Sequence, residues 1–108
     1  MSKKWTSSLA LSLLLGVIAH SGAVNAAGDA TAGAGKVATC AACHGADGVP
    51  SVAIYPQLAG QDAAALESSL KAFRAGERTG GMAAMMAPQA ANLSDQDIAD
   101  IAAHYSTL

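Results

Sequence analysis

The sequence is poor in the large side chains that fill a protein core. Aromatic residues make up 4% of its 108 residues: two tyrosines, one phenylalanine and one tryptophan. Because Trp5 lies in the N-terminal segment, the rest of the chain has only Tyr55, Phe73 and Tyr105. A domain of this size struggles to build a self-sufficient hydrophobic core. We therefore expect a bulky apolar group that is not an amino acid to complete the core.

Charged residues are also scarce, at 13% of the chain. Without Lys3 and Lys4, four basic residues stand against eight acidic ones, which gives a net charge of about −4. Nucleic-acid binding depends on Lys and Arg neutralising phosphates, so no nucleic-acid partner is expected. The acidic residues are scattered, and neither a phosphate-cradling loop nor a Ser/His/Asp arrangement occurs. The sequence therefore predicts no catalytic residues.

Residues 1–26 have the pattern of a secretory signal peptide. Lys3 and Lys4 give a basic start, an uncharged apolar run covers residues 9–19, and residues 24–26 have the spacing that a signal peptidase reads. The apolar run is shorter than the ~20 residues of a membrane-spanning helix. An uncleaved N-terminal anchor is the alternative. We predict cleavage after Ala26, which leaves residues 27–108 as one domain in the periplasm, without a membrane span.

The pattern of apolar residues predicts an all-α domain with three main helices, since no segment alternates like a strand for long. The first helix is expected over residues 29–39, with Asp29 as its N-cap and Gly33 at a close approach to another helix. The second is expected over residues 61–75, with Gly76 ending it. Its apolar stripe consists of Leu66, Leu70 and Phe73.

The third helix has the clearest signals. Ser94 is the expected N-cap, and Asp97 stands three residues later, at the capping-box position. Its apolar positions follow at helical spacing: Ile98, Ile101, Ala102 and Tyr105. Between the helices, residues 45–55 and residues 78–92 contain many turn formers and are expected to be loops.

The two cysteines of the chain stand together in the run Cys40-Ala41-Ala42-Cys43-His44. C-x-x-C-H is the attachment motif of a c-type haem. Two thiols at this spacing can each add across one vinyl group of the same porphyrin edge, and the histidine can reach the iron from one face. We predict one covalent haem on Cys40 and Cys43, with His44 as the proximal ligand of the iron.

Other uses of this motif remain open. A thioredoxin-like dithiol would need a βαβ context, and the sequence has no strand pattern. A disulfide between Cys40 and Cys43 would close a tiny loop and constrain little. A zinc site needs four ligands, and His44 and His104 with the two cysteines would supply that number. The export signal, the C-x-x-C-H spacing and the sparse core together favour haem.

Further motifs follow the attachment sequence. They are Tyr55-Pro56-Gln57-Leu58-Ala59-Gly60-Gln61, Phe73-Arg74-Ala75-Gly76-Glu77-Arg78, a methionine-rich loop, and Leu93-Ser94-Asp95-Gln96-Asp97-Ile98. In this order the sequence resembles class I cytochromes c, and most of all the bacterial cytochrome c4 and c-553 branch. The resemblance covers essentially all of residues 27–108. It implies the class I cytochrome c fold, with three main helices and long loops around one covalently bound haem.

The resemblance also implies roles for single residues. Pro56 matches the proline whose carbonyl oxygen accepts a hydrogen bond from the ring of the proximal histidine, which would fix the tautomer of His44. Gly33 and Val37 match the residues of the first helix that cross the last one, near Ile101 and Tyr105.

The sixth iron ligand implied by the resemblance is a methionine from the loop before the last helix. Met86 lies seven residues before Leu93, which is the spacing that best resembles the branch. Met85 is the second candidate and Met82 the third. The imidazole of His104 could also bind iron, but His104 lies beside the apolar stripe of the last helix, so we expect it to be partly exposed rather than a ligand.

Arg78 and Arg74 are candidates to contact the haem propionates, because a guanidinium suits a carboxylate fork. The alternative is that each side chain lies on a solvated face of the domain and contacts no propionate. We favour this alternative for Arg74.

With both axial positions of the iron filled, the resemblance implies electron transfer rather than catalysis. The sequence thus predicts a periplasmic, monomeric carrier of single electrons between a redox protein donor and acceptor. A cytochrome subunit of a larger dehydrogenase or oxidase complex is the alternative. An enzyme or gas sensor would need an open iron, which the methionine loop argues against.

Overall fold

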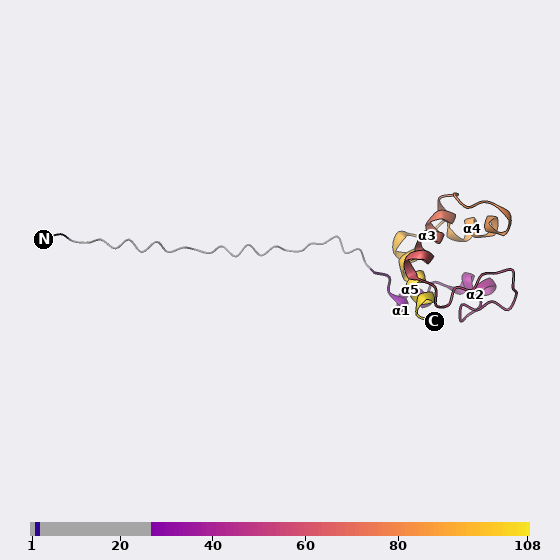
Figure 1. Cartoon of the computed structure of the whole chain (residues 1–108), viewed down its shortest axis with the longest axis horizontal. Helices are drawn as coiled ribbons and strands as arrows, with labels where there is room; N and C mark the ends of the chain where they lie inside the picture. The colour runs from indigo at the N-terminus through magenta and orange to yellow at the C-terminus, as the bar shows by residue number, and fades with distance from the viewer. Residues whose placement is uncertain (1, 3–26) are drawn as a thin grey trace.

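The computed structural model describes residues 27–108 together with Ser2, so the predicted signal peptide lies, except for Ser2, outside the described residues. The described chain is helical and contains no strand, which confirms the all-α class (Figure 1). None of its helices is long and apolar enough to cross a bilayer. Its elements are α1 (Ala30–Ala34), α2 (Ala38–His44), α3 (Ala63–Arg74), the 3₁₀-helix η1 (Gly81–Met85), α4 (Met86–Ala90) and α5 (Asp95–Ser106).

The prediction of one helix over residues 29–39 is wrong, because the chain forms two short helices there. Asp29 does cap α1, since its carboxylate accepts from the backbone N–H groups of Thr31 and Ala32 at 2.9 and 3.3 Å. The helix ends at Gly35, whose N–H bonds the carbonyl of Ala32 at 3.2 Å. Glycine is costly inside a helix, so the chain turns here before α2 begins.

The helix α1 and the residues just before it pack closely on α5. An added Cβ at Gly33 would lie 2.0 Å from the carbonyl oxygen of Asp100, and one at Gly28 would lie 1.7 Å from that of Ala99. Only glycine permits backbones to approach so closely. The predicted close approach of Gly33 to another helix is thereby confirmed, with α5 as the partner.

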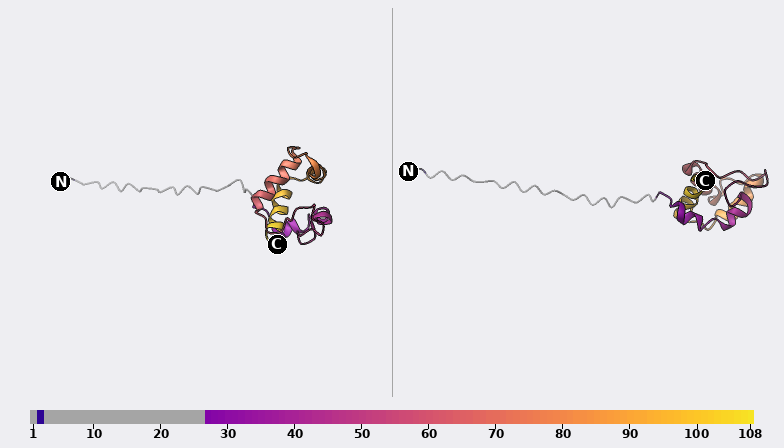
Figure 2. Two further views of the ribbon diagram at one scale, coloured as in Figure 1. Left: turned by 45° about the vertical axis from the view of Figure 1, so that its right-hand side comes forward. Right: turned by 90° about the horizontal axis from the view of Figure 1, so that it is seen from below.

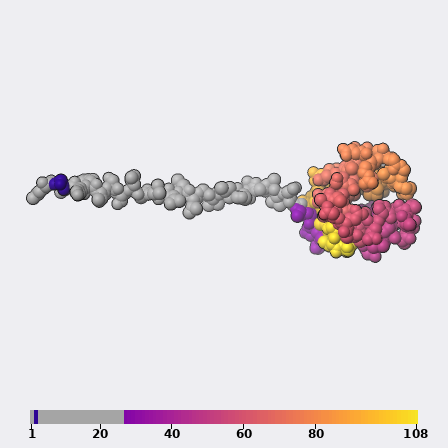
Figure 3. Space-filling model, viewed as in Figure 1, coloured from indigo at the N-terminus to yellow at the C-terminus, as the bar shows by residue number. Residues whose placement is uncertain are grey.

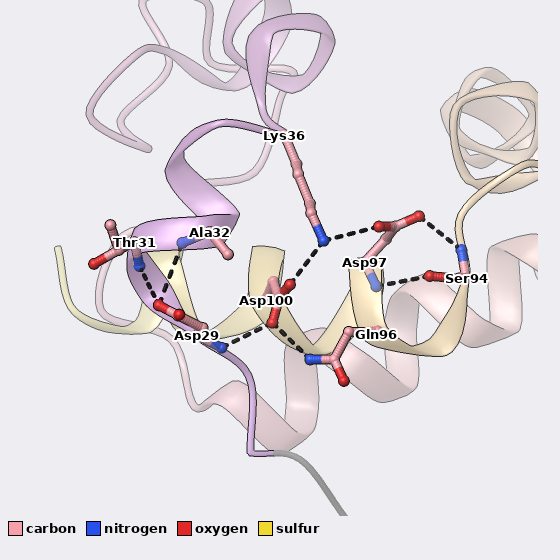
Figure 4. Close-up of polar contacts among 8 residues, drawn as sticks. All are labelled: Asp29, Thr31, Ala32, Lys36, Ser94, Gln96, Asp97 and Asp100. Carbon is pink, nitrogen blue, oxygen red and sulfur yellow. Dashed lines mark hydrogen bonds and ion pairs between the residues drawn. The ribbon is translucent and has the colours of Figure 1, made fainter.

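A polar network, which we call the Asp100 cluster, locks this crossing (Figure 4). The cluster consists of Asp29, Lys36, Gln96, Asp97 and Asp100. The buried carboxylate of Asp100 accepts from the backbone N–H of Asp29, the ammonium of Lys36 and the amide of Gln96, at 2.8, 2.7 and 2.8 Å. Lys36 also pairs with Asp97 at 2.9 Å. These contacts lower the pKa of Asp100 to about 2, and the hydrogen bond from Lys36 has the largest effect.

Local signals fix the start of α5 and the end of α3. The capping box of α5 is present, with Asp97 N–H donating to Ser94 Oγ and Ser94 N–H donating to Asp97 Oδ2, both at 3.0 Å. Gly76, at φ 73°, ends α3 in a Schellman motif, in which Glu77 N–H bonds the carbonyl of Ala72 at 2.9 Å. The predicted caps are confirmed, and they set the positions of α3 and α5 along the chain.

Arg74 joins α3 to the start of α5. Its guanidinium donates to the carbonyl oxygen of Leu93 at 3.0 Å and to the carboxylate of Asp95 at 2.6 Å. This pair is exposed to solvent and Arg74 does not line a cavity, which agrees with the favoured interpretation of Arg74 as part of a solvated face. The sequence pattern does not reveal the partner 21 residues away.

The core lies where α5 packs against both α1 and α3 (Figure 2). Its buried members are Val37, Leu66, Ile101, Ala102 and Tyr105. The predicted stripe of α5 is confirmed, since Ile98, Ile101, Ala102 and Tyr105 are all buried.

Residues 78–92 are not the loop that we predict, because η1 and α4 occupy most of the segment. The helix α4 packs against α3, and its last residue, Ala90, is fully buried. Tertiary packing of this kind overrides weak local propensity.

Candidate functional site

The structure contains a cavity of about 430 Å³. One of its walls is formed by α2 and the segment that follows α2, and another by η1 and α4. Figure 3 shows the surface hollowed between these two parts of the chain. The walls are mainly apolar, and Arg78 is the one charged residue among them. The apolar lining includes Ile54, Leu58, Leu66, Leu70, Phe73 and Ile101. A cavity of this size and character is typical of a site for a cofactor.

The cysteines of the motif lie in one wall of this cavity, both half-buried and unpaired. They stand three residues apart on α2, which places them on one face of the helix. Burial raises the pKa of the Cys40 thiol. Two thiols on one face are what attachment to two points of one porphyrin edge requires.

His44, the last residue of α2, is 5% exposed and also lines the cavity. Its Nδ1 lies 2.9 Å from the carbonyl oxygen of Pro56, the contact that the family resemblance implies. Because a carbonyl oxygen only accepts, Nδ1 carries the proton, and Nε2 keeps the lone pair that a metal ion needs. The edge of the Tyr55 ring faces the imidazole at 6.2 Å between centroids.

All three candidate methionines line the cavity, but their exposure differs. Met82 and Met85, both in η1, are each 49% exposed. Met86 is half-buried and is the first residue of α4. Pro88 falls in the first turn of α4, where its missing N–H removes no helical hydrogen bond.

The arginines have different surroundings. Arg78 is exposed, lines the cavity and stacks over the ring of Phe73 at 4.3 Å. Arg74 does not line the cavity, because Leu93 and Asp95 hold it.

The zinc alternative finds no support in the geometry. In residues 27–108, no three His, Cys, Asp or Glu side chains come together as a metal site. His104 packs on Tyr105 at 5.1 Å between ring centroids and does not line the cavity.

The residues that surround the cavity fit a haem. The thiols of Cys40 and Cys43 provide two covalent anchors, and His44 provides a neutral imidazole nitrogen for the iron. A thioether from η1 or α4 is available as a second axial ligand. The apolar walls exclude water from a macrocycle, and no acidic side chain lines the cavity to oppose its propionates.

One feature of the cavity wall escapes the sequence analysis. The hydroxyl of Tyr105 is buried and has no hydrogen-bond partner in the described structure. The stripe of α5 predicts the burial of the ring, and a tyrosine in such a stripe is itself the signal that a polar group must be satisfied there.

Comparisons with known proteins agree with this geometry. Residues 30–108 match the family model for cytochrome c. The chain is 62% identical over 81 residues to cytochrome c-554(548) of Halomonas halodenitrificans, an alignment that covers 75% of this chain and 98% of that protein. It is 44% identical over 99 residues to cytochrome c4 of Pseudomonas aeruginosa, covering 92% of this chain and 47% of that protein.

A solved structure is also similar. The crystal structure of reduced recombinant cytochrome c4 from Pseudomonas stutzeri matches with a TM-score of 0.60 at 44% identity, over 74% of this chain and 45% of the other. The chain thus spans about half the length of the cytochrome c4 relatives, and nearly all of cytochrome c-554(548).

Proposed function

The chain belongs to the cytochrome c family, and from that premise we propose that it is a periplasmic, monomeric carrier of single electrons between two redox proteins. Family membership implies a covalent haem c, and Cys40, Cys43 and His44 fit its attachment motif. The haem, when bound, supplies a one-electron couple between ferric and ferrous iron. The side chains of the cavity decide what this couple can do.

The observation that carries the proposal is the hydrogen bond from His44 Nδ1 to the Pro56 carbonyl at 2.9 Å. This bond supports His44 as the proximal ligand, because it fixes the ring orientation and leaves Nε2 free for the iron. It also makes the imidazole a stronger electron donor to the metal.

Met86 is our proposed sixth ligand. It is half-buried, whereas half of the surface of Met82 and of Met85 is exposed to solvent. Burying the ligand sulfur favours a stable bond to iron, and a thioether ligand raises the reduction potential. Met85 is the second choice.

The rest of the cavity suits electron transfer rather than catalysis. Its apolar walls exclude water, and with His44 and Met86 both bound to the iron no coordination position would be left for a substrate. Arg78 is the proposed contact of a haem propionate, since it is the charged group at the cavity and its guanidinium is exposed. Partners would approach the mouth, and a small, transient contact is typical of redox encounters.

An optical spectrum of the protein, oxidised and reduced, followed by acid–organic extraction, tests the proposal. We expect a reduced α-band of c-type position that stays with the polypeptide through extraction. The oxidised protein should show the weak red band of an iron–thioether bond. A colourless protein from a host that attaches haem would refute the proposal. Rapid carbon monoxide binding without unfolding would refute the closed iron.

A further inference from the structure

The acceptor of the hydrogen bond from His44 lies in a segment at the surface of the domain. Residues 51–54, Pro56 and Gln57 are all exposed, and between them only Tyr55 is half-buried. A backbone segment with so little buried surface opens at a small cost in free energy. The 2.9 Å contact between the Pro56 carbonyl oxygen and His44 Nδ1 therefore depends on what fixes the ends of this segment.

A single buried residue, Gly48, is bonded to the backbone on both sides of this contact. Its N–H donates to the carbonyl oxygen of the residue that follows His44, at 3.1 Å. Its own carbonyl oxygen accepts from the N–H groups of Leu58 and Ala59, at 2.8 and 3.1 Å. Because Leu58 stands two residues after Pro56, Gly48 joins the backbone that carries the imidazole to the backbone that carries its acceptor.

The conformation and the surroundings of Gly48 leave no space for a side chain. Its φ is 75°, in the left-handed region that favours glycine. An added Cβ would lie 2.8 Å from the backbone nitrogen of Ala59 and 3.0 Å from Cδ1 of the Tyr105 ring. The same stretch is bonded to the end of α5, because Gly60 N–H donates to the Tyr105 carbonyl oxygen at 3.0 Å. A Cβ at Gly48 must therefore displace the backbone that follows the Pro56 carbonyl.

We propose that Gly48 is a positioning residue, which fixes the hydrogen bond between His44 and Pro56 and through it sets the reduction potential. The inference rests on the proposed haem function. A hydrogen bond from Nδ1 to a carbonyl oxygen makes the imidazole a more basic ligand, and a more basic ligand favours ferric iron. Movement of the Pro56 carbonyl away from Nδ1 weakens this effect, so it raises the reduction potential.

The variant Gly48→Ala tests this role, because its Cβ displaces the backbone at Ala59. At a fixed ambient potential we expect the ferrous-to-ferric ratio to rise about threefold to tenfold, which is roughly 30–60 mV for a one-electron couple. An unchanged potential in Gly48→Ala with haem bound would overturn the inference.

Gly76→Ala is the matched control for backbone strain. Gly76 has nearly the same φ, 73°, but an added Cβ there meets nothing within 4 Å, and Gly76 does not line the cavity. Both variants should lose stability, because alanine is strained at a positive φ. Only Gly48→Ala should change the potential.

Hydrogen exchange, followed by NMR on the ferrous protein, gives a second test that the parent protein alone can decide. If Gly48 fixes the contact, the His44 Nδ1 proton and the amide protons of Leu58 and Ala59 exchange through one common opening. In Gly48→Ala all three should exchange about tenfold faster, because the opening costs less free energy.

An opening in the parent protein that releases the His44 ring proton and leaves the Leu58 and Ala59 amides protected would overturn the inference, even if Gly48→Ala does not fold. A failure of the haem function itself is distinguishable, because the parent protein would then lack the c-type spectrum.

Discussion

Two regions of this domain differ in what completes their packing. At the crossing of α1 with α5, protein atoms satisfy one another: glycine backbones touch α5, and the Asp100 cluster pairs its charges. Around the cavity, by contrast, α2, η1 and α4 leave a space that is walled by apolar side chains and thiols. Protein atoms therefore complete the packing of the first region, whereas in the second they leave a space that fits the cofactor.

The largest expected effect is that of withholding the haem, which tests whether the crossing can stand alone. In Cys40→Ala/Cys43→Ala, without haem, we expect a largely unfolded chain, because the core lacks bulk. Circular dichroism and amide hydrogen exchange would measure the loss of helix. Native helicity in the haem-free protein would contradict the prediction. Protection confined to α1 and α5 would show that the crossing folds independently of the cavity.

Removing the proposed sixth ligand perturbs only the cavity region. Met86→Ala should abolish the iron–thioether band and lower the reduction potential, because the ferrous state loses its thioether ligand. Met85→Ala and Met82→Ala are the matched controls and should keep the band. If the band persists in Met86→Ala and disappears in Met85→Ala, the ligand is Met85.

A side chain added at the crossing of α1 with α5 should lower the stability of the fold without changing the ligands of the iron. Gly33→Ala places a Cβ against the Asp100 carbonyl, which we expect to cost about 1–3 kcal/mol of unfolding free energy through overpacking. Gly80→Ala is the control, because an added Cβ there meets nothing within 4 Å. Urea unfolding of the holoprotein measures both variants. Equal stability of Gly33→Ala and the parent protein would mean that the helices can separate without cost.

The smallest effect is expected at acid pH. The ordinary pKa of an aspartate is 3.8, and that of Asp100 is lowered to about 2, so the charged Asp100 stabilises the fold fully above pH 4. This contribution is lost as the pH falls from about 4 to below 2. Asp100→Asn should be less stable at neutral pH and lose less stability in this window. Thermal unfolding against pH tests this, with Glu67→Gln as the control that keeps the parent profile.

The sequence predicts best those features that depend on neighbouring residues. The capping box of Ser94 and Asp97, the end of α3 at Gly76 and the C-x-x-C-H spacing are local patterns, and each appears in the structure. The close approach at Gly33 is also foreseen, because a glycine inside a helix needs a packing reason.

Features that depend on distant contacts are missed. Nothing near Arg74 indicates its pairing with Asp95. Nothing near Lys36 indicates that its ammonium donates a hydrogen bond to Asp100, 64 residues away. The helix α4 escapes prediction for the same reason, since packing on α3 stabilises it. The choice among the methionines of the site is likewise a question of tertiary geometry rather than of spacing.

The distribution of charge has a consequence for encounters in solution. Arg78 stands at the wall of the cavity. Four acidic residues gather instead at the first turn of α5 and at the helix crossing, and none of them lines the cavity: Asp29, Asp95, Asp97 and Asp100. Lys36 pairs with Asp97 and Asp100, and Arg74 pairs with Asp95, so the charge that a partner meets at the cavity is that of Arg78. An acidic partner would therefore be oriented before contact, and raising the ionic strength should slow electron exchange with it.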